Sequence, residues 1–229
     1  MSRNTVTPVP RDIWRTISRT IERVKADDVP GVDTPPAGVH DRSMKKRSVV
    51  AFLGSPRPRG NTDTLAECVL EGAREVGCET QCFTLRTLKV HPCTGCEYCW
   101  KKGKPCIFED DGTRLYDAMA AADIFLFATP VYWYGPTAIM KAFIDRLVVF
   151  NKPEGRPLVR GKAALLVSAW EEQGMKAVEP MVRLFELGFE HLELRFEGSL
   201  LLDELGPKEA ARDRPGALDS AWALGRSLA

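Results

Sequence analysis

One short stretch, Gly54 to Thr62, constrains this chain more than any other. It follows an apolar run, residues 48–53, of the kind found in a buried parallel strand. After it, apolar residues recur at helical spacing from Asp63 to Val76. The stretch is therefore predicted to be a strand-to-helix turn flanked by glycines. Such a turn directs free backbone N–H groups and the positive end of a helix dipole at one point, which suits an anion.

The side chains of this turn indicate which anion it would hold. Neutral donors and two cations surround one glycine: Ser55, Arg57, Arg59, Gly60, Asn61 and Thr62. The Gly-x-Gly-x-x-Gly pattern of dinucleotide turns is absent from the stretch, as is the Lys-Ser or Lys-Thr pair of a triphosphate loop. A single terminal phosphate, as in FMN, fits this set. An ordinary turn with an Asn-Thr cap is the alternative.

Length and charge limit the class of protein. The chain has 229 residues and a formal net charge of +1, enough for one α/β core and an appendage. Nucleic-acid binders usually show a basic surplus, so we expect no nucleic-acid partner. No apolar run approaches the roughly 20 residues that span a bilayer, and no secretion signal is visible, so we expect no membrane association. Seven cysteines without such a signal favour a reducing cytoplasm, where clustered cysteines bind metal or do redox chemistry.

Strands and helices alternate from residue 47, which predicts one domain over 47–229 after an N-terminal extension of a helix and a linker, 1–46. We expect strands at 48–53, 79–85, 123–128, 162–168 and 192–197. We expect helices at 63–76, 113–121 (capped by Asp111), 136–150, 176–187 and 213–228. Right-handed crossovers would make these strands an open, doubly wound parallel sheet with helices on both faces. Ligands of such sheets bind at the carboxyl ends of the strands, where three loops would meet: 54–62, 129–135 and 169–174.

The second of these loops predicts a wall for a flat ring. It reads Thr129-Pro130-Val131-Tyr132-Trp133-Tyr134-Gly135, and a tricyclic ring would stack on its three successive aromatic side chains. The alternative is that Val131, Tyr132 and Trp133 close the end of the core. The third loop can cover the ring edge, where Gln173 could hydrogen-bond a flavin carbonyl. The sequence identifies no catalytic proton donor.

A cysteine cluster lies in the predicted loop 89–111. Cys93, Cys96 and Cys99 follow one another with two residues between them, and Cys106 comes six residues later. The first three have the spacing of ligands in bacterial ferredoxin-type 4Fe–4S sites. A loop of reduced thiols without metal is an alternative. A structural zinc site is less natural, because its cysteine pairs are usually a dozen or more residues apart.

Together these motifs resemble a known family. The turn Gly54–Thr62, the loop Thr129–Trp133 and the run Lys141–Arg146 are similar, in the same order, to the NADPH-dependent FMN reductase branch of the flavodoxin-like superfamily. The cysteine run followed by Asp110-Asp111 resembles its iron–sulfur flavoprotein subgroup. The resemblance covers 47–200, and the extension 1–46 has no counterpart in it.

The resemblance implies non-covalently bound FMN, a 2-1-3-4-5 strand order and a homodimer or homotetramer. It implies a phosphate site made of Ser55, Arg57, Asn61 and Thr62. It implies a ring site made of Pro130, Val131, Tyr132 and Trp133. It makes Cys93, Cys96, Cys99 and Cys106 the ligands of a cluster, if there is one. The loop 169–174 departs from the family because it lacks the usual glycine-rich character.

The sequence therefore predicts an FMN-dependent oxidoreductase. NAD(P)H would reduce the flavin, and the flavin would reduce a quinone-like or other small acceptor. The alternative is an electron carrier whose 4Fe–4S cluster hands electrons to a ferredoxin-like partner. A third interpretation is a non-enzymatic module whose four cysteines hold zinc. The sequence does not identify the acceptor or decide between NADH and NADPH.

Overall fold

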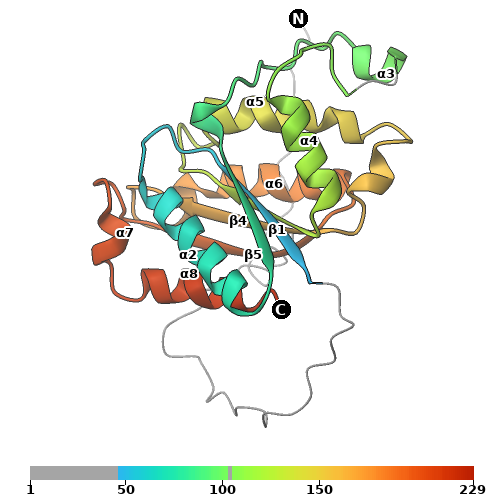
Figure 1. Cartoon of the computed structure of the whole chain (residues 1–229). Coiled ribbons are helices and arrows are strands. Elements are labelled where there is room, and N and C mark those ends of the chain that lie inside the picture. The colour runs from blue at the N-terminus through green and yellow to red at the C-terminus, as the bar shows by residue number, and fades with distance from the viewer. Residues whose placement is uncertain (1–45, 103–104) are drawn as a thin grey trace, which may run out of the picture. The chain divides into compact units, whose positions relative to one another are not determined.

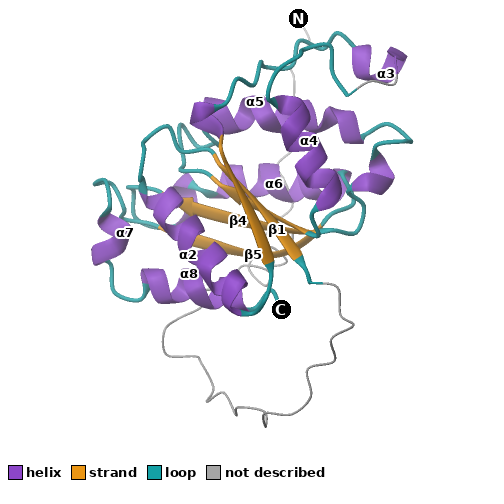
Figure 2. Cartoon of the chain, in the orientation of Figure 1, coloured by secondary structure: helices purple, strands orange, loops and turns teal. Residues whose placement is uncertain are grey.

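A computed structural model describes residues 46–102 and 105–229, so the predicted N-terminal extension, apart from its last residue, lies outside the described part. The strands form one parallel sheet (Figure 2). Its strand order is β2-β1-β3-β4-β5, which confirms the flavodoxin-like, doubly wound fold. Its strands are β1 (Ser48–Leu53), β2 (Glu79–Thr84), β3 (Ile124–Ala128), β4 (Ala163–Ala169) and β5 (Arg195–Leu202).

Helices cover both faces of this sheet (Figure 1). One face carries α2 (Asn61–Glu75), α7 (Ala210–Asp213) and α8 (Ala217–Arg226); the other carries α4 (Gly112–Ala121), α5 (Ala138–Arg146) and α6 (Glu179–His191). The short α3 (Tyr98–Lys102) lies in the cysteine loop. Four single turns of 3₁₀ helix complete the described elements: η1 (Leu85–Thr87), η2 (Leu147–Phe150), η3 (Arg156–Leu158) and η4 (Met175–Ala177).

The central strands are buried on both faces, which explains their continuous apolar sequences. On one face, Phe52 packs against Phe127 and Phe143, with the Phe52 and Phe143 ring centroids 4.6 Å apart. On the other, α2 and α8 cross so closely that a Cβ on Gly72 or Gly225 would collide with the backbone of the facing helix. The core thus holds the carboxyl ends of the strands, and the loops that follow them, in fixed positions.

The ends of several predicted elements were wrong, most of all near the C-terminus. α6 does not stop before Gly188 but continues to His191, since a glycine inside a helix lowers its stability without ending it. β5 then begins at Arg195 and runs to Leu202. The predicted last helix, 213–228, corresponds to α8, which begins only after Gly216 (φ 73°) and ends at Arg226. The short α7 before it was not predicted.

The caps of two helices also differ from expectation. Asp111 does not cap α4, because its carboxylate accepts the Lys89 N–H at 2.8 Å. Asp110 accepts the Gly112 N–H instead, at 2.9 Å. The predicted helix 136–150 begins only after Thr137, whose hydroxyl accepts the Met140 N–H, and it tightens into η2 after Arg146.

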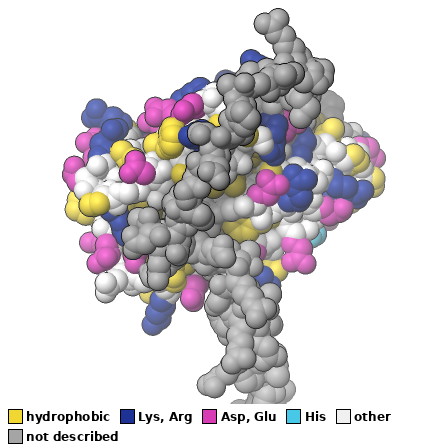
Figure 3. Space-filling view, turned by 90° about the horizontal axis from the view of Figure 1, so that it is seen from below, with side chains coloured by type: hydrophobic (Ala, Val, Ile, Leu, Met, Phe, Trp, Pro, Cys, Tyr) yellow, Lys and Arg dark blue, Asp and Glu magenta, His cyan; other side chains and the backbone are white. Residues whose placement is uncertain are grey.

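The surface carries mixed charge. Over the described residues on the face shown in Figure 3, Lys and Arg side chains lie among Asp and Glu side chains, as a formal net charge of +1 leads one to expect. Among these described residues, no helix combines the length and the apolar character needed to cross a membrane.

Candidate functional site

A pocket opens at the carboxyl ends of the strands, where the loops after β1, β3 and β4 meet. It brings together these predicted binding residues: Ser55, Arg57, Gly60, Asn61, Thr62, Pro130, Val131 and Tyr132. Ala169, Trp170 and Glu171 add a wall from the third loop, and Leu205, Gly206 and Lys208 add another from the segment after β5. The predicted ligands Trp133, Tyr134 and Gln173 do not line it.

The first turn of α2 presents free donors to this pocket. Gly60 occupies the N-cap position without a side-chain cap, and the first backbone bond of the helix runs from Thr64 N–H to the Gly60 carbonyl, at 3.0 Å. Within the described part of the chain, no hydrogen bond uses the N–H groups of Asn61, Thr62 or Asp63. Three free N–H groups at the positive end of a 15-residue helix form a site for an anion.

Two buried hydroxyls lie beside these donors. Thr62 is 1% exposed, and its Oγ1 has no hydrogen-bond partner among the described residues. Ser55 is 2% exposed, and its Oγ bonds only to the backbone of Arg57, at 3.2 Å. Thr62 lines the pocket, and a buried unpaired hydroxyl costs about 1–3 kcal/mol, so a polar ligand that reached Oγ1 would remove this cost. A Cβ on Gly60 would lie 2.8 Å from Ser55 Oγ, so a side chain there would disturb this arrangement.

The Asn61 side chain does not face the pocket as a free donor. Its Nδ2 donates to the carbonyls of Leu205 (2.8 Å) and Pro207 (2.9 Å), and its Oδ1 accepts the Ala211 N–H at 3.1 Å. The predicted phosphate ligand Asn61 thus bonds through its side chain to residues 203–211, which we call the C-terminal strap. Only its backbone N–H remains for an anion.

The aromatic loop forms a tight hairpin that directs two of its rings outward. Tyr132 and Gly135 exchange backbone hydrogen bonds of 2.8 and 3.1 Å. Between them, Trp133 (φ 50°) and Tyr134 (φ 64°) adopt left-handed conformations, which cost roughly 1–3 kcal/mol each. Trp133 is 95% exposed. From this loop only Pro130, Val131 and Tyr132 line the pocket, together with the buried Trp170 from the third loop.

An ion pair that sequence reasoning missed supports the turn from behind. The buried Asp63 carboxylate lies 2.7 Å from the Arg86 guanidinium, which also donates to the Ser55 carbonyl at 3.3 Å. Burial raises the pKa of Asp63, and the Arg86 charge opposes that rise. The Thr137 hydroxyl donates to the Gly54 carbonyl at 2.6 Å, so the start of α5 is fixed to the same turn.

The four clustered cysteines line a second, apolar pocket. Cys93, Cys96, Cys99 and Cys106 share its wall with aliphatic and aromatic side chains and Arg146, and burial raises the pKa of the Cys99 thiol. Over the residues that the structure describes, no three or more Cys, His, Asp or Glu side chains are placed to hold a metal ion. The thiols are therefore near one another but not arranged as a ligand set for a 4Fe–4S cluster or zinc.

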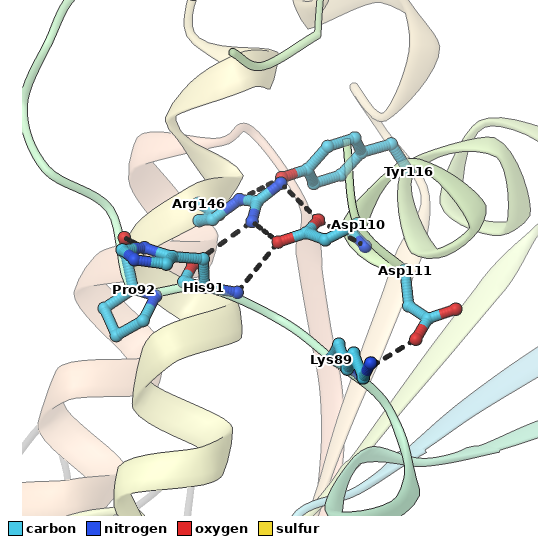
Figure 4. A network of polar contacts seen from close by, with 8 residues as sticks. Lys89, His91, Pro92, Asp110, Asp111, Tyr116 and Arg146 are labelled. Carbon is cyan, nitrogen blue, oxygen red and sulfur yellow. Dashed lines mark hydrogen bonds and ion pairs between the residues drawn. The ribbon is translucent and has the colours of Figure 1, made fainter. Parts of the chain in front are cut away.

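A buried guanidinium closes the base of this cysteine loop (Figure 4). Arg146, 1% exposed, contacts both carboxylate oxygens of Asp110, at 2.6 and 3.0 Å. It also donates to Tyr116 Oη (2.6 Å) and to the His91 carbonyl (3.1 Å). Burial by itself raises the pKa of Asp110, but the Arg146, His91 and Gly112 donors prevail and lower it. Both ends of the loop are thus held to the end of α5.

Comparison with known proteins identifies relatives of this chain. An iron–sulfur flavoprotein of Archaeoglobus fulgidus is 35% identical over 113 residues, 49% of this chain and 50% of the relative. YwqN of Bacillus subtilis, provisionally named an NAD(P)H-dependent FMN-containing oxidoreductase, is 25% identical over 183 residues, 78% of this chain and 97% of the relative. The chain thus spans about half the length of the iron–sulfur flavoproteins that it matches.

Solved structures share the fold. The NAD(P)H:quinone oxidoreductase of Methanothermobacter marburgensis superposes with a TM-score of 0.62 at 18% identity, over 80% of this chain and 96% of that one. A family model described as NADPH-dependent FMN reductase matches residues 47–193, which include the turn, the aromatic loop and the cysteine loop. The chain therefore belongs to the NADPH-dependent FMN reductase family.

Proposed function

We propose that the pocket at the strand ends binds FMN and that the protein is an NAD(P)H-dependent oxidoreductase acting on a quinone-like or other small acceptor. The observation that carries this proposal is Thr62 Oγ1, a buried hydroxyl without a described partner, beside three free N–H groups at the start of α2. These donors suit a terminal phosphate. Family membership supports flavin-dependent oxidoreduction as the chemistry.

Each wall of the pocket has its own part in holding FMN. The N–H groups of residues 61–63 and the hydroxyls of Ser55 and Thr62 would bind the phosphate. Val131 and Tyr132 would pack against the ring, with Trp170 closing the opposite side. Bound FMN would supply the redox chemistry between the nicotinamide and the acceptor. The residues of the chain fix its position and exclude water from one side.

We expect Thr62→Val to weaken FMN binding about 10-fold, because one hydrogen bond to a charged phosphate is lost. Riboflavin, which lacks the phosphate, should bind this variant and the unmodified protein equally. Thr64→Val is the matched control: Thr64 Oγ1 is also buried without a described partner, but Thr64 does not line the pocket. Flavin fluorescence titration measures both ligands, and NAD(P)H oxidation with a quinone measures activity. A protein that binds neither flavin would overturn the proposal.

A second candidate function is electron transfer through a 4Fe–4S cluster to a ferredoxin-like partner. Four cysteines line one pocket, and several relatives are named iron–sulfur flavoproteins. As placed, the thiols do not form a ligand set, so we derive no step through a cluster.

Metal analysis separates the two functions. The carrier requires iron and sulfide in the ratio of a 4Fe–4S cluster in protein purified without oxygen. Cys96→Ser should abolish both, whereas Cys82→Ser, outside the cysteine pocket, should not. For the reductase we expect FMN and steady NAD(P)H oxidation with a quinone in protein free of iron. Loss of that activity when iron is absent would contradict the reductase.

A further inference from the structure

We propose that Lys208, on the C-terminal strap, is a phosphate-binding residue of the pocket and favours a flavin that carries a terminal phosphate over one that does not. This inference rests on the proposed FMN site. The family match ends at residue 193, so the strap lies beyond the segment on which that match depends.

Hydrogen bonds hold the strap on both sides of Lys208. Asn61 bonds to the Pro207 carbonyl on one side and to the Ala211 N–H on the other, at 2.9 and 3.1 Å. The Leu205 N–H donates to the Trp170 carbonyl at 2.8 Å. Lys208 is therefore placed at the pocket by the first residue of α2, the helix whose free N–H groups face the same pocket.

The first half of the strap is fixed as well. The Asp203 carboxylate accepts the Gly174 N–H at 2.8 Å and pairs with Arg214 at 3.3 Å. Gly206 lies against the third loop: a Cβ there would be 2.8 Å from the Glu171 side chain. Because residue 206 is a glycine, the strap can pack closely against the third loop. The strap is therefore a fixed wall of the pocket.

The charges at this pocket are left uncompensated by the protein. The lining contains two cations, Arg57 and Lys208, and one carboxylate, Glu171. Neither cation forms an ion pair with any described residue. Three neighbouring arginines, by contrast, are paired: Arg59 with Glu209, Arg86 with Asp63 and Arg214 with Asp203.

A phosphate monoester would complete this balance. It carries about −1.5 to −2 charges at neutral pH, which two cations and the positive end of α2 offset together. Lys208 is exposed and the four-carbon stem of a lysine is flexible, so its ammonium can meet a phosphate held at the N–H groups without moving the backbone. Riboflavin has no phosphate, so it provides no negative charge for Lys208 to contact.

The test compares FMN with riboflavin on the full-length protein. We expect Lys208→Gln to weaken FMN about 10-fold and riboflavin less than about twofold, as loss of one charge-assisted contact requires. FMN affinity should also fall less steeply with added salt, because one screened charge is gone. Lys208→Arg should keep FMN within about threefold, since the charge remains. Lys46→Gln, a lysine just before β1 that does not line the pocket, is the matched control.

The outcomes separate this inference from the proposed function. If the unmodified protein binds no FMN, both the proposed function and the role of Lys208 are overturned. FMN binding that is unchanged in Lys208→Gln overturns the role of Lys208 and leaves the flavin site standing. If Lys208→Gln leaves FMN affinity unchanged but raises the KM for NADPH, then Lys208 binds the nicotinamide substrate, and the inference is also overturned. Equal weakening of FMN and riboflavin would mean that the variant disturbs the strap and not the phosphate contact.

Discussion

Replacing Asp110 with Ala is expected to lower the free energy of unfolding by about 3–5 kcal/mol, because it leaves a buried guanidinium without its counter-ion. Arg146 is 1% exposed and Asp110 12% exposed at their side chains. The same change removes the acceptor of the His91 and Gly112 N–H groups. Urea unfolding measures the loss, and the rate of thiol labelling at Cys93 and Cys106 reports whether the cysteine loop opens.

Two control variants separate the effect of the buried ion pair from that of losing any carboxylate. Asp145→Ala breaks an exposed pair with Lys141, 2.6 Å apart, and should cost less than about 1 kcal/mol. The double variant Asp110→Ala/Arg146→Met removes both buried charges and should recover part of the loss. If Asp110→Ala costs no more than Asp145→Ala, the buried ion pair does not fix the base of the loop.

The pH dependence of this ion pair has a definite sign. Because the pKa of Asp110 is lower in the folded protein, the pair stabilises the fold above the unfolded pKa of about 3.9. That stabilisation is lost as the pH falls through the lower folded value. The stability difference between the unmodified protein and Asp110→Ala should therefore be full at neutral pH and narrow below about pH 4.

The sheet could be predicted because its signals are local. β1, β3 and β4 are buried on both faces, so each is an almost entirely apolar run in the sequence, interrupted only by Ser48 and Ser168. β5 was misplaced because Leu192 and Leu194 are buried before the strand begins. These two leucines lie in the turn after α6, and they are apolar because they pack into the core there, not because they belong to a strand. Alternation of such residues cannot distinguish the two cases.

The same error hid the strap. Because the last strand was expected to end at residue 197, residues 203–211 were not predicted to lie at the carboxyl edge of the sheet. β5 in fact ends at Leu202, so the residues that follow it begin at that edge. The turn 54–62 could be singled out because its possible donors are adjacent in sequence. The partners of Asn61 are about 150 residues away along the chain, and nothing in their local sequence marks them.

The aromatic loop shows a second limit of sequence reasoning. Three adjacent aromatic residues suggested one continuous stacking wall, yet only Tyr132 lines the pocket. A four-residue hairpin turn places its two central side chains at the tip, here Trp133 and Tyr134 at positive φ. Such a turn normally has Asn or Gly at these two positions, so the residue types Trp and Tyr did not predict it.

Asn61→Asp is expected to weaken FMN binding about 100-fold, through two effects that act together. The new carboxylate lies at the start of α2 beside the phosphate, which it repels. It also presents oxygen to the Leu205 and Pro207 carbonyls, which now receive hydrogen bonds from Nδ2. Since two acceptors lose their donors, the strap should leave the pocket, and riboflavin binding should weaken as well, unlike in Lys208→Gln.

Release of the strap can be measured without flavin. Trypsin cleaves after lysine, so a strap that leaves the pocket should be cut after Lys208 faster in Asn61→Asp than in the unmodified protein. Asn151→Asp introduces the same charge where its oxygen faces the Arg156 guanidinium at 3.0 Å, and it should change neither FMN affinity nor cleavage. Asn61→Ala removes the same hydrogen bonds without adding charge, so it should speed cleavage while weakening FMN less than Asn61→Asp does. If Asn61→Asp retains FMN and resists trypsin after Lys208, then Asn61 does not hold this wall of the pocket, because a carboxylate cannot donate to either carbonyl.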